Sequence, residues 1–355
     1  MNSYTILAPS LSRGGAESMA YKYGRYLISR GHDVTFLLLE DRIDKRYRDV
    51  ESKIIGSGSL KSSFFKLLFY KGDNERIHIS LIPFYTFLFQ ITRFLRMDFG
   101  YKYIYTVHNN LDQDLPKKGI HALVRMWYLF SLRKSRNVYA VCRELALELN
   151  RLDIRCSTIS NVTDWKFDPT LGKRQVQDPM SIVMVGRLDY QKDYDYAFKF
   201  FESLVDNGIQ FSVDIYGEGP EKNHIESIVK DKANLDVTVK GYSDDLENLL
   251  HDEKYGVLLL SSRYEGFGLV LIEALYKGIF PVSRDCDFGP REIISHGVGH
   301  LLPYEFKSDA VQGFIQVMKE WSSYSEEERL KRINEAKCKI EASIGDEWAQ
   351  LESLQ

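Results

Sequence analysis

The chain has 355 residues, of which 44% are hydrophobic and 27% are charged, and this balance excludes a disordered or collagen-like protein. Its length exceeds what one ordinary hydrophobic core accommodates, which predicts two domains. The net charge of −3 combines 25 basic and 15 acidic residues in positions 1–160 with an acidic remainder. This contrast indicates two domains with different partners, and nucleic acid or an anionic membrane are candidates for the basic part.

The N-terminus has neither a basic segment nor a long apolar run, so we expect no secretory signal. The longest apolar stretch, residues 80–95, is interrupted by Pro83, Gln90 and Arg93 and is too short and polar to span a bilayer. The four cysteines are scattered and form no zinc-type pair, which fits a reduced compartment. We therefore expect a cytoplasmic protein.

Strand-like apolar runs alternate with helix-length segments from the start of the chain. Strands are predicted at 4–10, 33–40, 77–82, 102–109 and 137–142. A helix is predicted over 14–31, because Met19, Tyr23, Tyr26 and Leu27 recur at helical spacing and Gly31 is typical of a helix end. These elements predict an α/β domain over residues 1–162.

Residues 163–180 are polar, irregular and rich in turn formers, which indicates a linker. Five further strands are predicted at 181–186, 210–217, 236–241, 255–262 and 278–284. Their continuous Val/Ile/Leu runs are typical of parallel strands buried on both faces. We predict a second domain over 181–335, and a C-terminal helix over 336–355 that could return to the first domain. Two doubly wound parallel-sheet domains would bind ligands at the carboxyl ends of their strands, in the cleft between them.

Two cations follow the first strand of the second domain. Arg187 and Lys192 lie five residues apart in a strand-to-helix loop, which suits a diphosphate held by fixed charges and a helix N-terminus. The alternative is a pair of solvated surface cations. Gly217, after the next strand, permits close approach of the backbone to a ligand, or simply a tight loop.

A Gly-Phe-Gly turn flanked by two glutamates, Glu265 and Glu273, precedes and enters an apolar helix. We predict that this helix begins near Gly268, so that its free N–H groups can bind an anion. Glu273 lies within the helix, where a buried carboxylate would need a donor such as a pair of sugar hydroxyls. The alternative for Glu273 is an ordinary exposed helix glutamate.

Four segments together resemble retaining glycosyltransferases of family 4, which have the GT-B fold. Glu265 to Glu273 is similar to the E-x7-E pattern of that family, and "VGRLDYQKD" resembles its V-G-R-L-x-x-x-K motif. "SLSRGGAES" resembles its N-terminal glycine loop. "DCDFGPREIISHGVGHLL" resembles a segment of members that build bacterial surface glycans. The four segments occur in the expected order over most of the chain.

The resemblance implies roles for individual residues. Arg187 and Lys192 would bind the donor pyrophosphate, Glu273 would hold the ribose hydroxyls, and Glu265 would contact the transferred sugar. Further expected ligand contacts come from the first domain's glycine loop, a histidine near the reacting sugar, the backbone beside Glu265 and the nucleobase region: Gly14, Gly15, His108, Gly266, Phe267, Gly268, Leu269, Gly241 and Tyr242.

The mechanism that the resemblance implies is metal-independent transfer with retention of anomeric configuration, without a cofactor. Negative charge develops on the departing diphosphate, and cations placed there stabilise the transition state more than the ground state. The donor is expected to be a UDP-sugar, with a GDP-sugar as the alternative. Whether Glu265 acts as a covalent nucleophile is left open by the sequence.

The acceptor is expected to be a glycan carried on a lipid, since residues 53–136 hold 14 basic and five acidic residues among many aromatics. Leu60, Phe64, Leu67 and Leu68 recur at helical spacing beside Lys61, Lys66 and Lys71, a pattern that suits the inner face of a membrane or an ordinary core-facing helix. No RNA-binding signature is present, so nucleic acid is not expected. The remaining alternatives are a soluble or protein acceptor, and a catalytically silent nucleotide- or glycan-binding scaffold.

Overall fold

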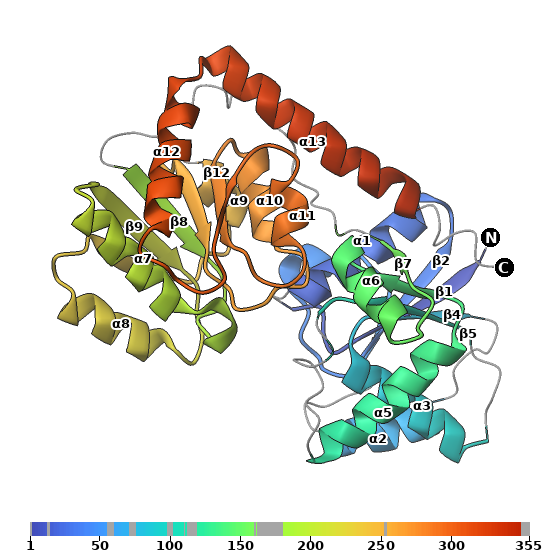
Figure 1. Ribbon diagram of the computed structural model, residues 1–355. Coiled ribbons are helices and arrows are strands. Elements are labelled where there is room, and N and C mark those ends of the chain that lie inside the picture. Colours follow the sequence, from blue (N-terminus) through green and yellow to red (C-terminus); the bar gives the residue numbers. More distant parts are fainter. Residues whose placement is uncertain are drawn as a thin grey trace. The chain divides into compact units, whose positions relative to one another are not determined.

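The computed structural model describes residues 2–12, 15–54, 60–70, 76–97, 102–109, 111, 119–159, 161, 180–251 and 254–348. The chain divides into two compact units, one formed by residues 1–161 and 346–355 and the other by residues 162–345. Figure 1 shows the strands and helices of each unit. Each unit contains one parallel sheet, which confirms the prediction of two doubly wound α/β domains.

The first unit contains a seven-stranded sheet in the order β3-β2-β1-β4-β5-β6-β7, with every pairing parallel. Its strands are β1 (Ser3–Ala8), β2 (Asp33–Leu38), β3 (Ser52–Ile54), β4 (Ile77–Ser80), β5 (Lys102–Val107), β6 (Val138–Ala140) and β7 (Ser157–Thr158). Its helices are α1 (Gly15–Ser29), the 3-10 turn η1 (Lys45–Tyr47), α2 (Leu60–Phe69), α3 (Pro83–Leu95), α5 (Gly119–Lys134) and α6 (Arg143–Arg151).

Helix α1 packs closely on the centre of this sheet. Met19, Tyr23 and Leu27 are fully buried, as their spacing predicts, whereas Tyr26 is only partly buried. Gly24 permits the contact, because a Cβ atom there would lie 2.3 Å from Cζ of Phe36 in β2. Gly31 has the positive φ of +82° that suits a helix terminus, which confirms the predicted end of α1.

The second unit contains a six-stranded parallel sheet in the order β10-β9-β8-β11-β12-β13. Its strands are β8 (Met180–Val185), β9 (Phe211–Tyr216), β10 (Val237–Gly241), β11 (Val257–Leu260), β12 (Phe280–Arg284) and β13 (His300–Leu302). Its helices are the 3-10 turn η3 (Tyr190–Lys192), α7 (Tyr194–Asp206), α8 (Lys222–Asp231), α9 (Leu246–His251), α10 (Leu269–Tyr276), α11 (Pro290–Ile294), α12 (Ala310–Ser323) and most of α13 (Glu326–Trp348).

Strand order reverses at β8, whose two neighbours are β9 and β11. Helices α7 and α8 group on one side of the sheet, and α10 and α11 on the other (Figure 1). Fully buried aliphatic residues such as Ile182, Val183 and Leu258 fill the sheet, as expected for strands covered on both faces. Ligands of such sheets bind at the carboxyl ends of the strands where the order reverses, so we expect a ligand site in the segments after β8 and β11.

Candidate functional site

A lysine–carboxylate pair joins the segments that follow β8 and β11. The Nζ atom of Lys192, at the end of η3, lies 2.5 Å from Oε1 of Glu265, in the loop before α10. The hydroxyl of Ser262 donates to the same carboxylate oxygen at 2.6 Å. Glu265 is 7% exposed, so this charge is largely removed from water and requires these partners. An ammonium carries three N–H donors, and therefore Lys192 can hold Glu265 and a ligand oxygen at the same time.

Arg187 is the exposed member of the predicted cation pair. Its Nε atom lies 3.4 Å from Oδ2 of Asp189, and its side chain is 78% exposed. Asp189 in turn accepts a hydrogen bond from the backbone N–H of Gln191 and caps η3. Because the Arg187 side chain is so exposed, this ion pair contributes little to stability. This exposure agrees with the solvated-cation alternative, and the contact of Arg187 with a phosphate stays a prediction.

The Gly-Phe-Gly turn begins helix α10 as predicted. Gly268 is the N-cap residue, with a left-handed φ of +87°, and α10 starts at Leu269. The side chain of Phe267 is buried, so only the backbone of this turn can face a ligand, while Gly266 and Leu269 are partly exposed. Glu273 lies in the second turn of α10 and is partly buried. The first turn therefore presents backbone N–H groups, the feature from which an anion site is built.

Two glycines predicted to approach a ligand pack against the protein's own backbone. A Cβ atom at Gly217 would lie 1.8 Å from the carbonyl oxygen of Gly186, so this position has to be glycine for internal packing alone. The N–H of Gly217 donates to the carbonyl of Gly241, which is the last residue of β10 and has a φ of +78°. The adjoining Tyr242 is 43% exposed. The tight-loop alternative thus accounts for Gly217 on its own, and its contact with a ligand stays a prediction.

The remaining predicted residues belong to the first unit. Gly14 lies outside the described residues, and Gly15 is the exposed first residue of α1, where a Cβ atom would have no neighbour within 4 Å. His108 follows β5; its Nε2 atom lies 3.0 Å from Oγ1 of Thr106, and its ring centroid lies 6.2 Å from that of Tyr23. Desolvation lowers the pKa of His108 to about 4, so the ring is neutral at pH 7.

Several residues at this edge of the second sheet were not predicted. Ser262 on Glu265, Asp189 beside Arg187, and Gly289 behind Phe267 all support the predicted groups. Gly289 lies in the segment 285–302, which resembles part of the family pattern, but the sequence indicates no role for this residue by itself. Ser262 and Asp189 had no signal beyond their nearness in sequence to Glu265 and Arg187.

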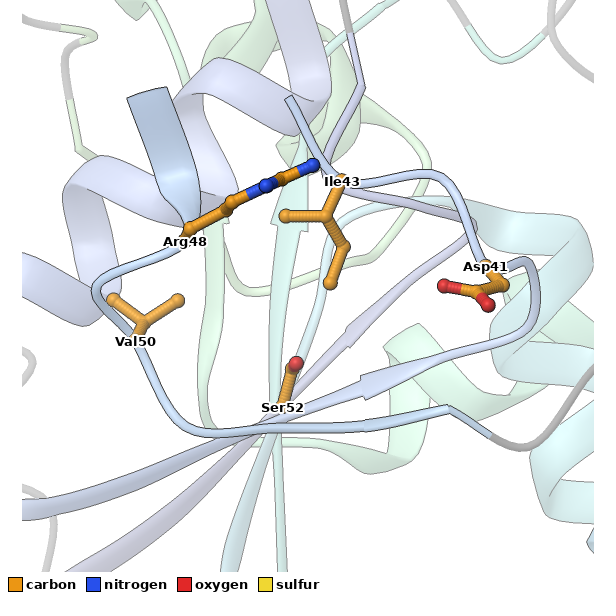
Figure 2. Close-up of a pocket in the computed structure, with 5 residues that line it drawn as sticks. All are labelled: Asp41, Ile43, Arg48, Val50 and Ser52. Carbon is orange, nitrogen blue, oxygen red and sulfur yellow. The ribbon is translucent and has the colours of Figure 1, made fainter. Parts of the chain in front are cut away.

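A hollow of about 420 Å³ lies in the first unit, beneath the connection between β2 and β3. Figure 2 shows its lining, in which Arg48 and Val50 lie on one side, Asp41 lies on the other, and Ile43 and Ser52 lie between them. The connection is held to the loop after β1, because Leu11 N–H donates to the carbonyl of Arg42 at 3.0 Å. The sequence singled out none of these residues.

Helices α2, α3 and α5 of the first unit pack side by side in the order α2-α3-α5 and carry exposed apolar side chains, and we call their exposed surface the face of α2, α3 and α5. Eight large apolar side chains on or next to these helices are at least half exposed: Phe65, Phe69, Phe94, Leu95, Met97, Leu123, Met126 and Phe130. None of the three helices contains an Asp or Glu. Among the described residues, no helix combines the length and apolarity needed to cross a bilayer.

This face differs in part from the stripe that the sequence indicated. Leu67 of α2 is buried in a core cluster with Phe89, as the core-facing alternative predicts, and the exposed aromatic side chains are Phe65 and Phe69. Lys66 is exposed. Lys71 and the side chains of Leu60, Lys61 and Phe64 lie outside the described residues.

Two doubly wound units, each built on a parallel sheet, are the architecture of the GT-B fold. The family described as "Glycosyltransferase Family 4" matches residues 13–165, and "Glycosyl transferases group 1" matches residues 172–338. The chain therefore belongs to the family 4-type glycosyltransferases of GT-B fold.

Relatives and solved structures agree with this family. The chain is 29% identical over 144 residues to a poly(glycerol-phosphate) alpha-glucosyltransferase of Bacillus subtilis (strain 168), a match that covers 40% of this chain and 21% of that protein. It is 27% identical over 219 residues to a poly(ribitol-phosphate) alpha-N-acetylglucosaminyltransferase of Staphylococcus aureus (strain COL), covering 60% of this chain and 43% of that protein. These matches thus span less than half of either relative.

The structure of TarM superposes with a TM-score of 0.76 at 14% identity, over 99% of this chain and 98% of the other. The structure of Anabaena Alr3699/HepE in complex with UDP and glucose gives a TM-score of 0.75 at 17% identity, over the whole of both chains. At such low identity these likenesses establish the fold.

Proposed function

We propose that the protein transfers a sugar from a UDP-sugar to a growing bacterial surface glycan, with retention of anomeric configuration. The observation that carries the proposal is the pair of Lys192 and Glu265, held at 2.5 Å beside the N-terminus of α10. One cation, one carboxylate and a set of backbone N–H groups at the switch point of a parallel sheet suit a donor that has a diphosphate at one end and a sugar at the other.

Charge development explains what each group contributes. When the bond between sugar and phosphate breaks, the diphosphate gains negative charge and the anomeric carbon becomes positive. Lys192, Arg187 and the N-terminus of α10 stabilise the leaving diphosphate, while the carboxylate of Glu265 lies on the side of the sugar. Since the N–H donors and side-chain cations supply this stabilisation, we propose that transfer does not require a metal ion, which activity in the presence of EDTA tests.

The nature of the acceptor rests on the relatives and on the exposed apolar face. One relative is named for poly(glycerol-phosphate) and another for poly(ribitol-phosphate). We propose an acceptor of this surface-polymer class, carried on a lipid, at the inner face of the cell membrane. The face of α2, α3 and α5, free of acidic residues and bearing exposed apolar side chains, is compatible with an anionic bilayer surface.

A panel of nucleotide sugars tests the proposed donor. We expect UDP-glucose, UDP-N-acetylglucosamine or UDP-galactose to raise Tm and to be hydrolysed slowly, because a ligand that binds the folded state stabilises it. The variant Lys192→Met should lose hydrolysis, whereas Lys199→Met, which removes an exposed lysine from α7, should not. A response to GDP-mannose alone would reassign the donor. A chain that binds UDP-sugars yet neither hydrolyses nor transfers them would be a silent scaffold.

A further inference from the structure

Asp193, the residue directly after Lys192, is buried between two arginines. Its Oδ1 atom accepts a hydrogen bond from Nη2 of Arg263 at 2.7 Å, and its Oδ2 atom accepts one from Nη1 of Arg284 at 2.6 Å. Asp193 is 6% exposed, so its pairing with the two arginines is not a chance contact at the protein surface. It also adopts the left-handed conformation, with φ 46° and ψ 66°, which is uncommon for a residue other than glycine.

Both arginines are themselves fixed by the surrounding protein. The guanidinium of Arg284 lies between the rings of Tyr196 and Tyr304, at 4.5 Å and 4.3 Å from their centroids, and its Nε donates to the carbonyl of Tyr304 at 2.6 Å. The guanidinium of Arg263 lies 4.2 Å from the ring centroid of Tyr190, and its Nε donates to the carbonyl of that residue at 3.0 Å. Asp193 therefore binds two cations whose orientations are already set.

These contacts tie together the two segments that present the proposed reacting groups. Asp193 adjoins Lys192, and Arg263 lies two residues before Glu265. The backbone reinforces the same junction, because the N–H of Arg263 donates to the carbonyl of Gln191 at 2.8 Å and the hydroxyl of Ser261 donates to the carbonyl of Lys192 at 2.6 Å. Loss of the Asp193 charge would leave two buried or half-buried guanidinium groups without their anion and loosen the junction.

We infer that Asp193 is a positioning residue, which fixes the separation of Lys192 and Glu265 through its bonds to Arg263 and Arg284. The inference rests on the proposed function for its consequence in catalysis, because it makes the pair of Lys192 and Glu265 a preorganised unit rather than two mobile side chains. The carboxylate of Asp193 is enclosed by its arginines and acts on the reaction only through its neighbours.

The test uses Asp193→Asn, which keeps the shape of the side chain and removes its charge. We expect kcat with the responding UDP-sugar to fall by about tenfold to a hundredfold, the effect of misplacing a reacting group. The Kd of UDP should change by less than about threefold, since ground-state contacts with the nucleotide are retained. The matched control is Asp195→Asn, which removes an exposed carboxylate two positions further along, paired with His224, and should leave both constants unchanged.

A second variant covers the case in which Asp193→Asn does not fold. Arg263→Gln alters a side chain that is 28% exposed and keeps the pair of Asp193 and Arg284. It should lower kcat, as Asp193→Asn does, and each chain should still bind as many UDP molecules as the native protein. An unchanged kcat in Asp193→Asn or, where that variant does not fold, in Arg263→Gln would overturn the inference. So would a parallel loss of kcat and UDP binding in a folded variant, which a merely structural role would produce.

A chemical readout separates failure of this inference from failure of the proposed function. In the native chain Lys192 is 18% exposed and bonded to Glu265, so it should react slowly with an amine-acylating ester. In Asp193→Asn we expect acylation of Lys192 to be at least about twofold faster, because its charge-assisted bond is weakened. This measurement needs no substrate. Equal rates in the two proteins would overturn the inference even if transfer from UDP-sugars is established.

Discussion

Gly289 lies directly against the backbone of Phe267, where a Cβ atom at position 289 would be 2.1 Å from the Phe267 carbonyl oxygen. The segment before α11 thus supports the turn that begins α10 from behind. Gly289 also has a φ of +77°, so two separate reasons require glycine at this position.

Replacement of Gly289 by alanine is expected to destabilise the protein by more than about 2 kcal/mol, from backbone strain and the collision together. Thermal unfolding of purified variants measures this change. Two controls separate the causes. Gly208→Ala has a φ of +72° and no neighbour within 4 Å, so it should cost about 1 kcal/mol. Gly313→Ala, inside α12, should be neutral or stabilising. Equal stability of all three variants would refute the packing explanation.

Arg187→Ala and Lys192→Ala are each expected to lower kcat by about a hundredfold or more, as the loss of a charge contact to the leaving diphosphate would. Steady-state rates with the responding UDP-sugar measure the effect. The two variants differ in their second consequence, because only Lys192→Ala leaves the buried carboxylate of Glu265 without its cation, and it should also lower Tm. Near-normal kcat in both would remove the diphosphate role.

Glu273→Ala is expected to weaken nucleotide binding rather than the chemical step, because this glutamate is proposed to hold the ribose hydroxyls. Isothermal calorimetry should show a Kd for UDP at least about tenfold higher, the scale of one lost charged hydrogen bond. Glu226→Gln, which removes a partly exposed glutamate from α8, is the control for the change in charge. Unchanged affinity of Glu273→Ala for UDP would contradict the assignment.

The stability of the protein should decline in acid because of His108. Desolvation lowers its pKa to about 4 from the ordinary 6.5, so between these values the unfolded chain binds a proton that the folded protein does not. The neutral ring makes its full contribution to the free energy of unfolding above pH 6.5. This contribution, at most about 3 kcal/mol, is lost as the pH falls through 4. Tm measured from pH 8 to pH 4 should fall less steeply in His108→Gln than in the native protein. His224→Gln, on an exposed ring, should reproduce the native slope.

Binding to vesicles should depend on the face of α2, α3 and α5. Vesicles containing phosphatidylglycerol are expected to float the native protein, and floating should weaken with salt because the attraction is partly electrostatic. Phe65→Ser with Phe69→Ser removes two exposed aromatic side chains and should reduce floating, and Lys66→Glu should do the same by reversing a charge. Absent or salt-insensitive floating would favour a soluble acceptor. Equal floating of the native chain and of a variant that combines all three substitutions would show that this face does not make the membrane contact.

The long, periodic elements could be predicted from the sequence, whereas the short edge strands could not. The burial of Met19, Tyr23 and Leu27 follows from their spacing, and the start of α10 follows from Gly268. Strands β3, β7 and β13 have three, two and three residues, too few to establish an alternating or continuous apolar pattern. Their existence depends on a neighbouring strand to pair with, which is tertiary information.

The same distinction holds in the candidate site. Lys192 and Glu265 could each be identified by a motif, but their contact joins positions 73 residues apart and requires the fold. Asp193, Arg263 and Arg284 belong to three different segments, and nothing in the sequence around each of them indicates a shared ion-pair network. The reason for Gly217 also needed the structure, because the group that excludes a side chain is the carbonyl of Gly186.

The parallel pairing of β8 with β11, in which Ile182 is aligned with Val257, has a consequence for folding. These central strands are far apart in the chain, and closing so long a loop makes their pairing a slow, entropically opposed event. Lys192 lies in the segment after β8, and Glu265 lies in the segment after β11. A molecule that contacts both residues can therefore bind only after these two strands have paired. Binding of added nucleotide during refolding would therefore report when the sheet is complete, because the proposed binding groups follow β8 and β11.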